Sequence, residues 1–226
     1  MGRRTVIGDV AGRADAIRER IRRAGGDPDR IRLIAVTKGF GVDVVRAALA
    51  AGLVDVGESY AQEMLEKVDR LEEEPSLRWH FVGRLQRNKV RKLAPFVTLW
   101  HSVDRLSLGA EIARWAPGAR VLAQVDLSGE PTKGGCPPAM LPALVDGLMD
   151  LELDVRGLMG IGPLGAPEDA RPGFRLLREM AEKQGLSELS MGMTADIEVA
   201  VEEGATMVRV GAGLFGPRPG ASTVEH

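Results

Sequence analysis

The residue with the clearest capacity for covalent chemistry in this sequence is Lys38, which closely follows a largely apolar run over residues 31–36. Such a β-branched run is typical of a strand covered on both faces of a parallel sheet, because covered strands do not alternate with polar residues. Burial at the strand end would disfavour the ammonium form, lower the lysine pKa and make the amine nucleophilic. A nucleophilic lysine can form a Schiff base with an aldehyde. On this stretch alone, a lysine that extends into solvent is the more common alternative.

Two stretches near the C-terminus have the composition of a phosphate site. Ser190, Gly192 and Thr194 follow one predicted strand and open a helix, where hydroxyl groups and free backbone N–H groups favour an anion. Gly211-Ala212-Gly213 follows the last predicted strand. Helix capping by Thr194 and tight turns at the glycines would explain either stretch alone. Both stretches together with the lysine predict a phosphate-bearing aldehyde, for which pyridoxal 5′-phosphate is the obvious candidate.

Strand and helix patterns alternate along the rest of the sequence. Strands are predicted over residues 31–36, 54–57, 78–82, 97–103, 121–127, 153–159, 188–191 and 207–210. Helices are predicted over residues 9–24, 42–51, 60–73, 86–93, 105–115, 139–149, 173–184 and 195–203. This order predicts an α/β fold, a (β/α)8 TIM barrel with an extra N-terminal helix, as a single domain over residues 1–226. An open doubly wound sheet would normally use fewer strands.

Composition excludes several classes of function. Thirty basic and thirty-two acidic residues give a net charge of −2, so no field steers the protein onto nucleic acid or an anionic membrane. No stretch approaches the roughly 18 consecutive apolar residues of a membrane span. The single cysteine, Cys136, cannot form an internal disulfide, which is the profile of a reducing compartment. We therefore expect a cytoplasmic protein that binds neither nucleic acid nor membranes.

Beyond these patterns, a series of motifs resembles the pyridoxal phosphate homeostasis proteins (YggS/PROSC family) in order and spacing along nearly the whole chain. The motifs include Ala35-Val36-Thr37-Lys38, Gly57-Glu58-Ser59-Tyr60, Trp79-His80-Phe81-Val82-Gly83, His101-Ser102-Val103-Asp104, Leu189-Ser190-Met191-Gly192-Met193-Thr194 and Val208-Arg209-Val210-Gly211. Each motif is weak by itself, but the set is highly specific.

The resemblance implies a barrel of pyridoxal phosphate fold type III, similar to the N-terminal domain of alanine racemase. It implies that the cofactor is covalently linked to Lys38 and that Arg209 faces its pyridine nitrogen. The residues that would hold the phosphate are Ser190, Gly192 and Thr194, with the backbone of Gly211 and Ala212. Met191 and His80 would line the cavity, although plain core packing fits both residues nearly as well.

Two departures from the family pattern bear on cofactor affinity. Ser59 stands where the family commonly has Asn, so its hydrogen bond to the ring hydroxyl of the cofactor is expected to be shorter-reaching or bridged by water. Ala212 stands where the family commonly has Thr or Ser, which removes a hydroxyl group from the phosphate site. Because a hydrogen bond to a charged group contributes about 1.5–3 kcal/mol, we expect weaker binding than in a typical member.

The leading hypothesis is a carrier that buffers pyridoxal phosphate and delivers it to apo-enzymes, without substantial turnover. A racemase or decarboxylase of the same fold is the first alternative. Fold relatives recruit a catalytic tyrosine from a separate β-domain, and Tyr60, the only tyrosine of this sequence, is a poor substitute for it. A Schiff-base aldolase that uses Lys38 without a cofactor is the second alternative. Lys133, in the predicted loop after the fifth strand, is a weak candidate for a secondary aldehyde acceptor, on the basis of its expected exposure alone.

Overall fold

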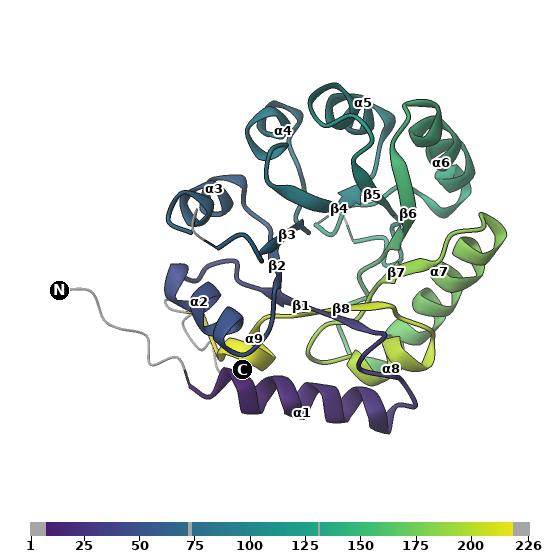
Figure 1. Ribbon diagram of the computed structural model, residues 1–226. Helices are drawn as coiled ribbons and strands as arrows, with labels where there is room; N and C mark the ends of the chain where they lie inside the picture. The colour runs from purple at the N-terminus through teal and green to yellow at the C-terminus, as the bar shows by residue number, and fades with distance from the viewer. Residues whose placement is uncertain (1–7, 72–73, 131, 219–226) are drawn as a thin grey trace.

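Eight parallel strands close into a barrel that helices surround (Figure 1). The computed structural model describes residues 8–71, 74–130 and 132–218. The strands are β1 Arg32–Val36, β2 Asp55–Glu58, β3 Arg78–Phe81, β4 Val97–Val103, β5 Arg120–Gln124, β6 Asp154–Met159, β7 Glu188–Ser190 and β8 Met207–Val210. The helices are α1 Val10–Arg23, α2 Val42–Ala50, α3 Ala61–Asp69, α4 Arg87–Leu93, α5 Leu106–Trp115, α6 Leu141–Asp150, α7 Arg171–Lys183, α8 Ile197–Glu202 and α9 Ala212–Phe215. The predicted TIM barrel with its extra N-terminal helix is confirmed.

Closure of the barrel brings the end of the first strand next to the ends of the last two strands. Each strand pairs in parallel with its neighbours in sequence, and β1 also pairs with β8, where Ile34 lies opposite Arg209. Because all the strands run in one direction, the carboxyl ends of β1, β7 and β8 meet on one face. Lys38 therefore shares this face with the two stretches that were predicted to bind phosphate.

The extra helix α1 lies along the outside of the barrel beside α8, α9 and α2 (Figure 1). Its inward side chains include Ile17 and Ile21, which are 3% and 1% exposed. Each such side chain contributes about 1.5–3 kcal/mol when it is fully buried. Arg13 Nη1 donates to the carbonyl oxygen of Leu214 at 3.0 Å, so the helix also braces the segment after β8.

Two layers of apolar side chains fill the molecule. The larger layer lies between the strands and the helices, and Met191 belongs to it. The smaller layer fills the inside of the barrel with Ile34, Val36, Leu99, Leu122, Met159 and Met207. Five buried polar residues, Asp55, His80, His101, Ser190 and Arg209, also take part in one bonded set inside the barrel. Apolar side chains therefore fill the interior of the barrel, and a set of hydrogen-bonded polar side chains crosses it.

The structure differs from the predicted elements mainly at helix ends. The helix predicted over residues 60–73 ends at Asp69, and the one predicted from residue 173 begins at Arg171, where Pro172 suits the first turn. A one-turn helix, α9, follows β8, where the sequence analysis predicted no helix. Among the described residues, no helix is long and apolar enough to cross a membrane.

Candidate functional site

Lys38 lies two residues beyond β1, where its side chain is half-buried. Burial lowers the pKa of its amine, and the positive charges of Arg218 and Arg209 lower the pKa further, while Glu58 acts in the opposite direction. The amine therefore loses its proton more readily than that of an ordinary lysine. This is the environment that the sequence predicted for a Schiff-base lysine.

Buried polar groups hold the backbone on both sides of Lys38. Glu58 Oε1 accepts hydrogen bonds from Thr37 Oγ1 and from Lys67 Nζ, each at 2.5 Å. Lys67 Nζ also donates to the carbonyl oxygen of Thr37 at 2.7 Å. On the other side, the backbone N–H of Gly39 donates to Glu63 Oε2 at 2.7 Å.

Sequence reasoning missed this support. Glu58 closes strand β2 with no exposed surface, and Lys67 is buried on α3 with 4% exposure. Two charged residues in buried positions could have signalled a pair, since buried charges are normally paired. The sequence pattern did not show that Glu58 and Lys67 would pair with each other.

Arg209 points into the barrel, which decides a question that strand alternation left open. Its guanidinium donates from Nη1 to Ser190 Oγ at 2.7 Å and from Nη2 to the carbonyl oxygen of Gly160 at 2.8 Å. Burial lowers the pKa of Arg209 to about 10, with Asp196 acting in the opposite direction, so the group remains a cation near neutral pH. Arg209 is thus a fixed hydrogen-bond donor near Lys38.

The loops after β7 and β8 converge beside the end of β1. The backbone N–H of Gly213 donates to Thr194 Oγ1 at 3.3 Å, which joins the two loops. A Cβ atom at Gly211 would lie 3.2 Å from the carbonyl oxygen of Val36, so this backbone fits closely against β1. The backbone N–H groups of Gly211 and Ala212 have no acceptor among the described residues. Two unused donors, a hydroxyl group and a nearby amine fit the phosphate and aldehyde groups of the predicted cofactor.

Gly192 has a conformational reason to be glycine in the loop after β7. Its φ is +88°, and a Cβ atom there would lie 2.5 Å from the Cβ of Ala200. The left-handed backbone and the close approach of α8 both exclude a side chain. The loop can therefore approach a ligand with its backbone.

Three of the remaining predicted site residues have other surroundings than the resemblance implied. Ser190 is fully buried, and its Oγ is engaged by Arg209 and by His101 Nδ1, which lies 2.8 Å away. His80 turns away from the carboxyl ends of the strands, with Nε2 2.8 Å from Asp55 Oδ1. Met191 packs in the layer between barrel and helices, so core packing, the alternative stated for it, describes its place.

Ser59 lies at the rim of the barrel. It lines a groove of about 710 Å³ together with Tyr60, Gln62, Arg84 and Lys89. Tyr60 is 56% exposed there. The structure thus brings Ser59 to the correct face of the barrel but records no hydrogen bond from its hydroxyl group to another described residue.

Lys133 does not have the exposure on which its prediction rested. Its Nζ donates to Glu130 Oε1 at 2.6 Å and to the carbonyl oxygen of Gly162 at 2.7 Å, and the side chain is only 13% exposed. A lysine that is engaged by a carboxylate is a weaker nucleophile than a free one. The expected exposure of Lys133 is therefore wrong, whereas its role as a secondary aldehyde acceptor stays a prediction. Within residues 8–71, 74–130 and 132–218, no group of His, Cys, Asp and Glu could hold a metal ion.

Comparisons with known proteins bear on the whole chain. A family model described as "Alanine racemase, N-terminal domain" matches residues 13–219. The pyridoxal phosphate homeostasis protein of Pseudomonas aeruginosa is 43% identical over a 222-residue alignment, which covers 95% of this chain and 96% of that protein.

Two solved structures of PipY from Synechococcus elongatus are also similar. The structure without PLP has a TM-score of 0.84 and 37% identity, and the structure with PLP bound has a TM-score of 0.81 and 35% identity. Each alignment covers 92% of this chain and 100% of the other. The resemblance that the motifs indicated is confirmed over nearly the full length.

Proposed function

The chain belongs to the alanine racemase N-terminal domain family and, within it, to the pyridoxal phosphate homeostasis proteins, and from this we propose that it binds pyridoxal 5′-phosphate and delivers it to apo-enzymes. One observation carries the proposal. Lys38, with its lowered pKa, lies on the face where Arg209 and the unused N–H groups of Gly211 and Ala212 converge. An amine, a fixed cationic donor and an anion cradle match the aldehyde, the ring and the phosphate of this cofactor.

In this proposal each residue has a defined task. Lys38 Nζ would attack the aldehyde carbon of the cofactor and form a reversible Schiff base, with the aldehyde oxygen and two protons leaving as water. The phosphate accepts hydrogen bonds from Thr194 and from the backbone of Gly211 and Ala212, and Gly192 lets the neighbouring loop approach closely. Arg209 donates to the ring nitrogen.

Ser190 serves the site through Arg209 rather than through the phosphate, because its hydroxyl group is already engaged. Ser59 approaches the ring hydroxyl from the rim. His80 and Met191 have no direct task in this proposal, because His80 is bonded to Asp55 and His101, and Met191 packs between the barrel and the helices. In this proposal, residues from several strands of the barrel together form one binding site for the cofactor.

A carrier fits the described site better than a racemase. Proton removal at an α-carbon needs a positioned base on each face of the substrate. The only tyrosine of the sequence, Tyr60, is exposed at the rim, and burial raises the pKa of the Cys136 thiol to about 11, which makes it a poor base. Arg209 remains a cation near neutral pH and can only donate a hydrogen bond to the ring nitrogen.

The proposal is tested with purified protein mixed with pyridoxal phosphate. We expect visible absorbance from the linked cofactor, which borohydride fixes to the peptide that contains Lys38. Lys38→Ala should lose this label, whereas Lys133→Ala, the matched lysine control, should keep it. Labelling at other lysines with none at Lys38 would reject the assignment.

Delivery and turnover need separate measurements. The loaded protein should restore activity to an apo-enzyme that depends on pyridoxal phosphate, and should do so more slowly than the free cofactor. Amino acids incubated with the loaded protein in heavy water should gain no α-deuterium at enzymatic rates, on the order of 1 s⁻¹. Rapid exchange that depends on Lys38 would favour the racemase alternative.

A further inference from the structure

A continuous line of hydrogen-bonding side chains crosses the inside of the barrel and ends at Arg209. Asp55 Oδ1 lies 2.8 Å from His80 Nε2, and His80 Nδ1 lies 2.9 Å from His101 Nε2. His101 Nδ1 lies 2.8 Å from Ser190 Oγ, which accepts a hydrogen bond from Arg209. We refer to Asp55, His80, His101 and Ser190 as the interior chain.

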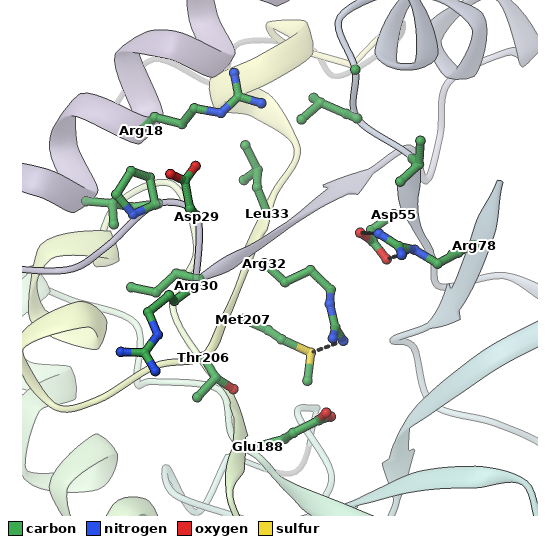
Figure 2. Close-up of a pocket in the computed structure, with 16 residues that line it drawn as sticks. Arg18, Asp29, Arg30, Arg32, Leu33, Asp55, Arg78, Glu188, Thr206 and Met207 are labelled. Atoms are coloured by element: carbon green, nitrogen blue, oxygen red, sulfur yellow. Dashed lines mark hydrogen bonds and ion pairs between the residues drawn. The ribbon is translucent and has the colours of Figure 1, made fainter. Parts of the chain in front are cut away.

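The interior chain begins on the face of the barrel opposite Lys38. Figure 2 shows this end, where Arg78 binds Asp55 through two N–H groups at 2.9 and 2.6 Å. Asp55, Arg78 and His80 also line a cavity of about 160 Å³ at the amino ends of the strands. The two histidines and the serine are at most 1% exposed. The interior chain therefore connects a cavity at one face to the candidate site at the other.

The surroundings of the interior chain decide its charges. Burial favours a higher pKa for Asp55, but hydrogen bonds from His80 and Arg78 outweigh burial and hold the pKa below its ordinary value. Burial lowers the pKa of His80, although Asp55 opposes this shift. Burial also lowers the pKa of His101, and the charges of His80 and Arg209 add to that effect. Near neutral pH, Asp55 is thus a carboxylate and both histidines are neutral.

With these charges, only one arrangement of hydrogens satisfies every contact. A carboxylate only accepts, so His80 carries its hydrogen on Nε2 and has an unprotonated Nδ1. His101 must then donate from Nε2, which leaves its own Nδ1 unprotonated. Ser190 must donate its one hydroxyl hydrogen to that Nδ1, and its lone pairs remain for Arg209. Asp55 thereby determines, across three hydrogen bonds, that Ser190 donates its hydrogen to His101 and keeps its lone pairs directed toward Arg209.

We propose that Asp55, His80 and His101 are positioning residues for Arg209, which they orient by holding Ser190 as its acceptor. The inference rests on the proposed cofactor function, in which Arg209 donates to the ring nitrogen. Ser190 Oγ and the carbonyl oxygen of Gly160 engage the two terminal nitrogens of the guanidinium, which fixes its plane. Without the interior chain, the hydroxyl hydrogen of Ser190 is no longer held toward His101, so the lone pairs of Oγ no longer keep one direction toward Arg209.

The arrangement also explains why Ser190 is unsuited to bind phosphate. Its single hydroxyl hydrogen is committed to His101, so it has none to donate to an anion. Thr194 and the backbone N–H groups of Gly211 and Ala212 carry the phosphate alone.

Uptake of a proton by His80 would reverse the direction of the hydrogen bonds along the interior chain. A doubly protonated His80 would donate from Nδ1 to His101, which would donate from Nδ1 to Ser190. Ser190 would then face two donors, and a positive charge would enter the barrel interior beside buried Arg209. The charged groups that face the interior chain are Arg32 on β1, Arg78 on β3, Arg120 on β5, Arg156 on β6, Glu188 on β7 and Arg209 on β8. Most of these groups are cations, which disfavour a further positive charge, so the functional arrangement is the one in which both histidines are neutral.

The first test requires no variant of the interior chain. Long-range ¹H–¹⁵N spectra of the protein, recorded with and without added pyridoxal phosphate, distinguish the two neutral tautomers of histidine from imidazolium. The sequence has three histidines, and His226→Ala identifies the signals of the third. We expect His80 and His101 as neutral Nε2–H tautomers near pH 7. An Nδ1–H tautomer or an imidazolium for either residue would overturn the proposal.

The second test is a double-mutant cycle on cofactor affinity, using His80→Leu and Ser190→Ala. Each variant should weaken binding of pyridoxal phosphate about tenfold, in the range of one lost hydrogen bond. The double variant should be no weaker than either single variant, because both act through the same link to Arg209. Fully additive losses would show that the two residues act separately and would refute the proposal.

A matched control separates positioning from damage to the core. Leu99→Ala removes interior volume next to the interior chain without touching its hydrogen bonds, and should lower stability while both tautomers persist. If wild-type protein binds no cofactor, the proposed function fails, and the tautomer measurement still decides whether the interior chain has the stated polarity. Displaced tautomers in a protein that binds the cofactor normally would reject the positioning role alone.

Discussion

Lys67 Nζ lies 2.5 Å from Glu58 Oε1, and the two side chains are only 5% and 0% exposed. Lys67 Nζ also donates to the carbonyl oxygen of Thr37, the residue before Lys38. The pair links α3, β2 and the end of β1 through the carbonyl and hydroxyl groups of Thr37. A buried ion pair is costly to desolvate, so it is weak evidence for stability. Its place suggests that it defines the path of the backbone at Lys38.

Lys67→Met should therefore destabilise the protein strongly, because Glu58 would remain buried without its counter-charge. We expect a loss of about 3–5 kcal/mol in the free energy of unfolding, measured by urea titration. Adding Glu58→Gln should recover a large part of that loss. Arg18→Met, which breaks the exposed pair with Asp15, is the control and should cost less than about 1 kcal/mol. Equal effects of the two single variants would contradict the structural role of the buried pair.

The reactivity of Lys38 should depend on the charge of Arg218. Burial is the larger cause of the lowered lysine pKa, and the charge of Arg218 adds to it. Arg218→Ala removes a cation beside the ammonium group, so the pKa of Lys38 should rise and its reaction with an aldehyde should need a higher pH. The pH profile of cofactor attachment rates measures this shift. Arg218→Lys keeps the charge and should leave the profile in place.

Restoration of a hydroxyl group in the phosphate cradle should strengthen binding. Ala212 is exposed at the start of α9, so Ala212→Ser is sterically acceptable and adds a donor beside the unused N–H groups. We expect an affinity gain of up to about tenfold for pyridoxal phosphate, since a hydrogen bond to a charged group contributes about 1.5–3 kcal/mol before the side chain is ordered.

The opposite substitution in the same cradle is Thr194→Val, which should weaken pyridoxal phosphate binding by a similar factor. Pyridoxal, which has no phosphate, serves as the matched ligand, and its affinity should change little in either variant. Equal changes for both ligands would place the cradle elsewhere.

Acid should destabilise the protein in a window set by its buried histidines. Burial holds the folded-state pKa values of His80 and His101 below the unfolded value of about 6.5, so the unfolded chain binds more protons below that pH. The stabilising contribution is complete above about pH 6.5 and is lost as the pH falls toward the folded values, by up to about 1.4 kcal/mol per pH unit for each histidine. Urea titrations between pH 7 and 5 should give a flatter profile for His101→Leu than for wild type. His226→Ala should leave the profile unchanged.

Local sequence patterns predicted much of the candidate site. Eight alternating strand and helix patterns determined the barrel, because residue periodicity records which faces are buried. A lysine after the first strand and two glycine-containing stretches after the last two strands predicted the candidate site, because the carboxyl ends of parallel strands share one face. Helix ends were less certain, and α9 was missed, since its four residues contain too few turns to show a period.

The orientation and partners of the site residues were decided only by the tertiary structure. Whether Arg209 points inward depends on the register of β8 against β1, which no single strand encodes. The link of Ser190 to His101 and Asp55 joins residues from strands β7, β4 and β2, which become neighbours only after the barrel closes. Lys133 looked exposed because its loop is polar, but a carboxylate and a carbonyl group from separate segments enclose its amine. Sequence patterns determine which residues reach one face of the barrel, whereas charge, burial and hydrogen-bond direction there depend on contacts between segments far apart in the chain.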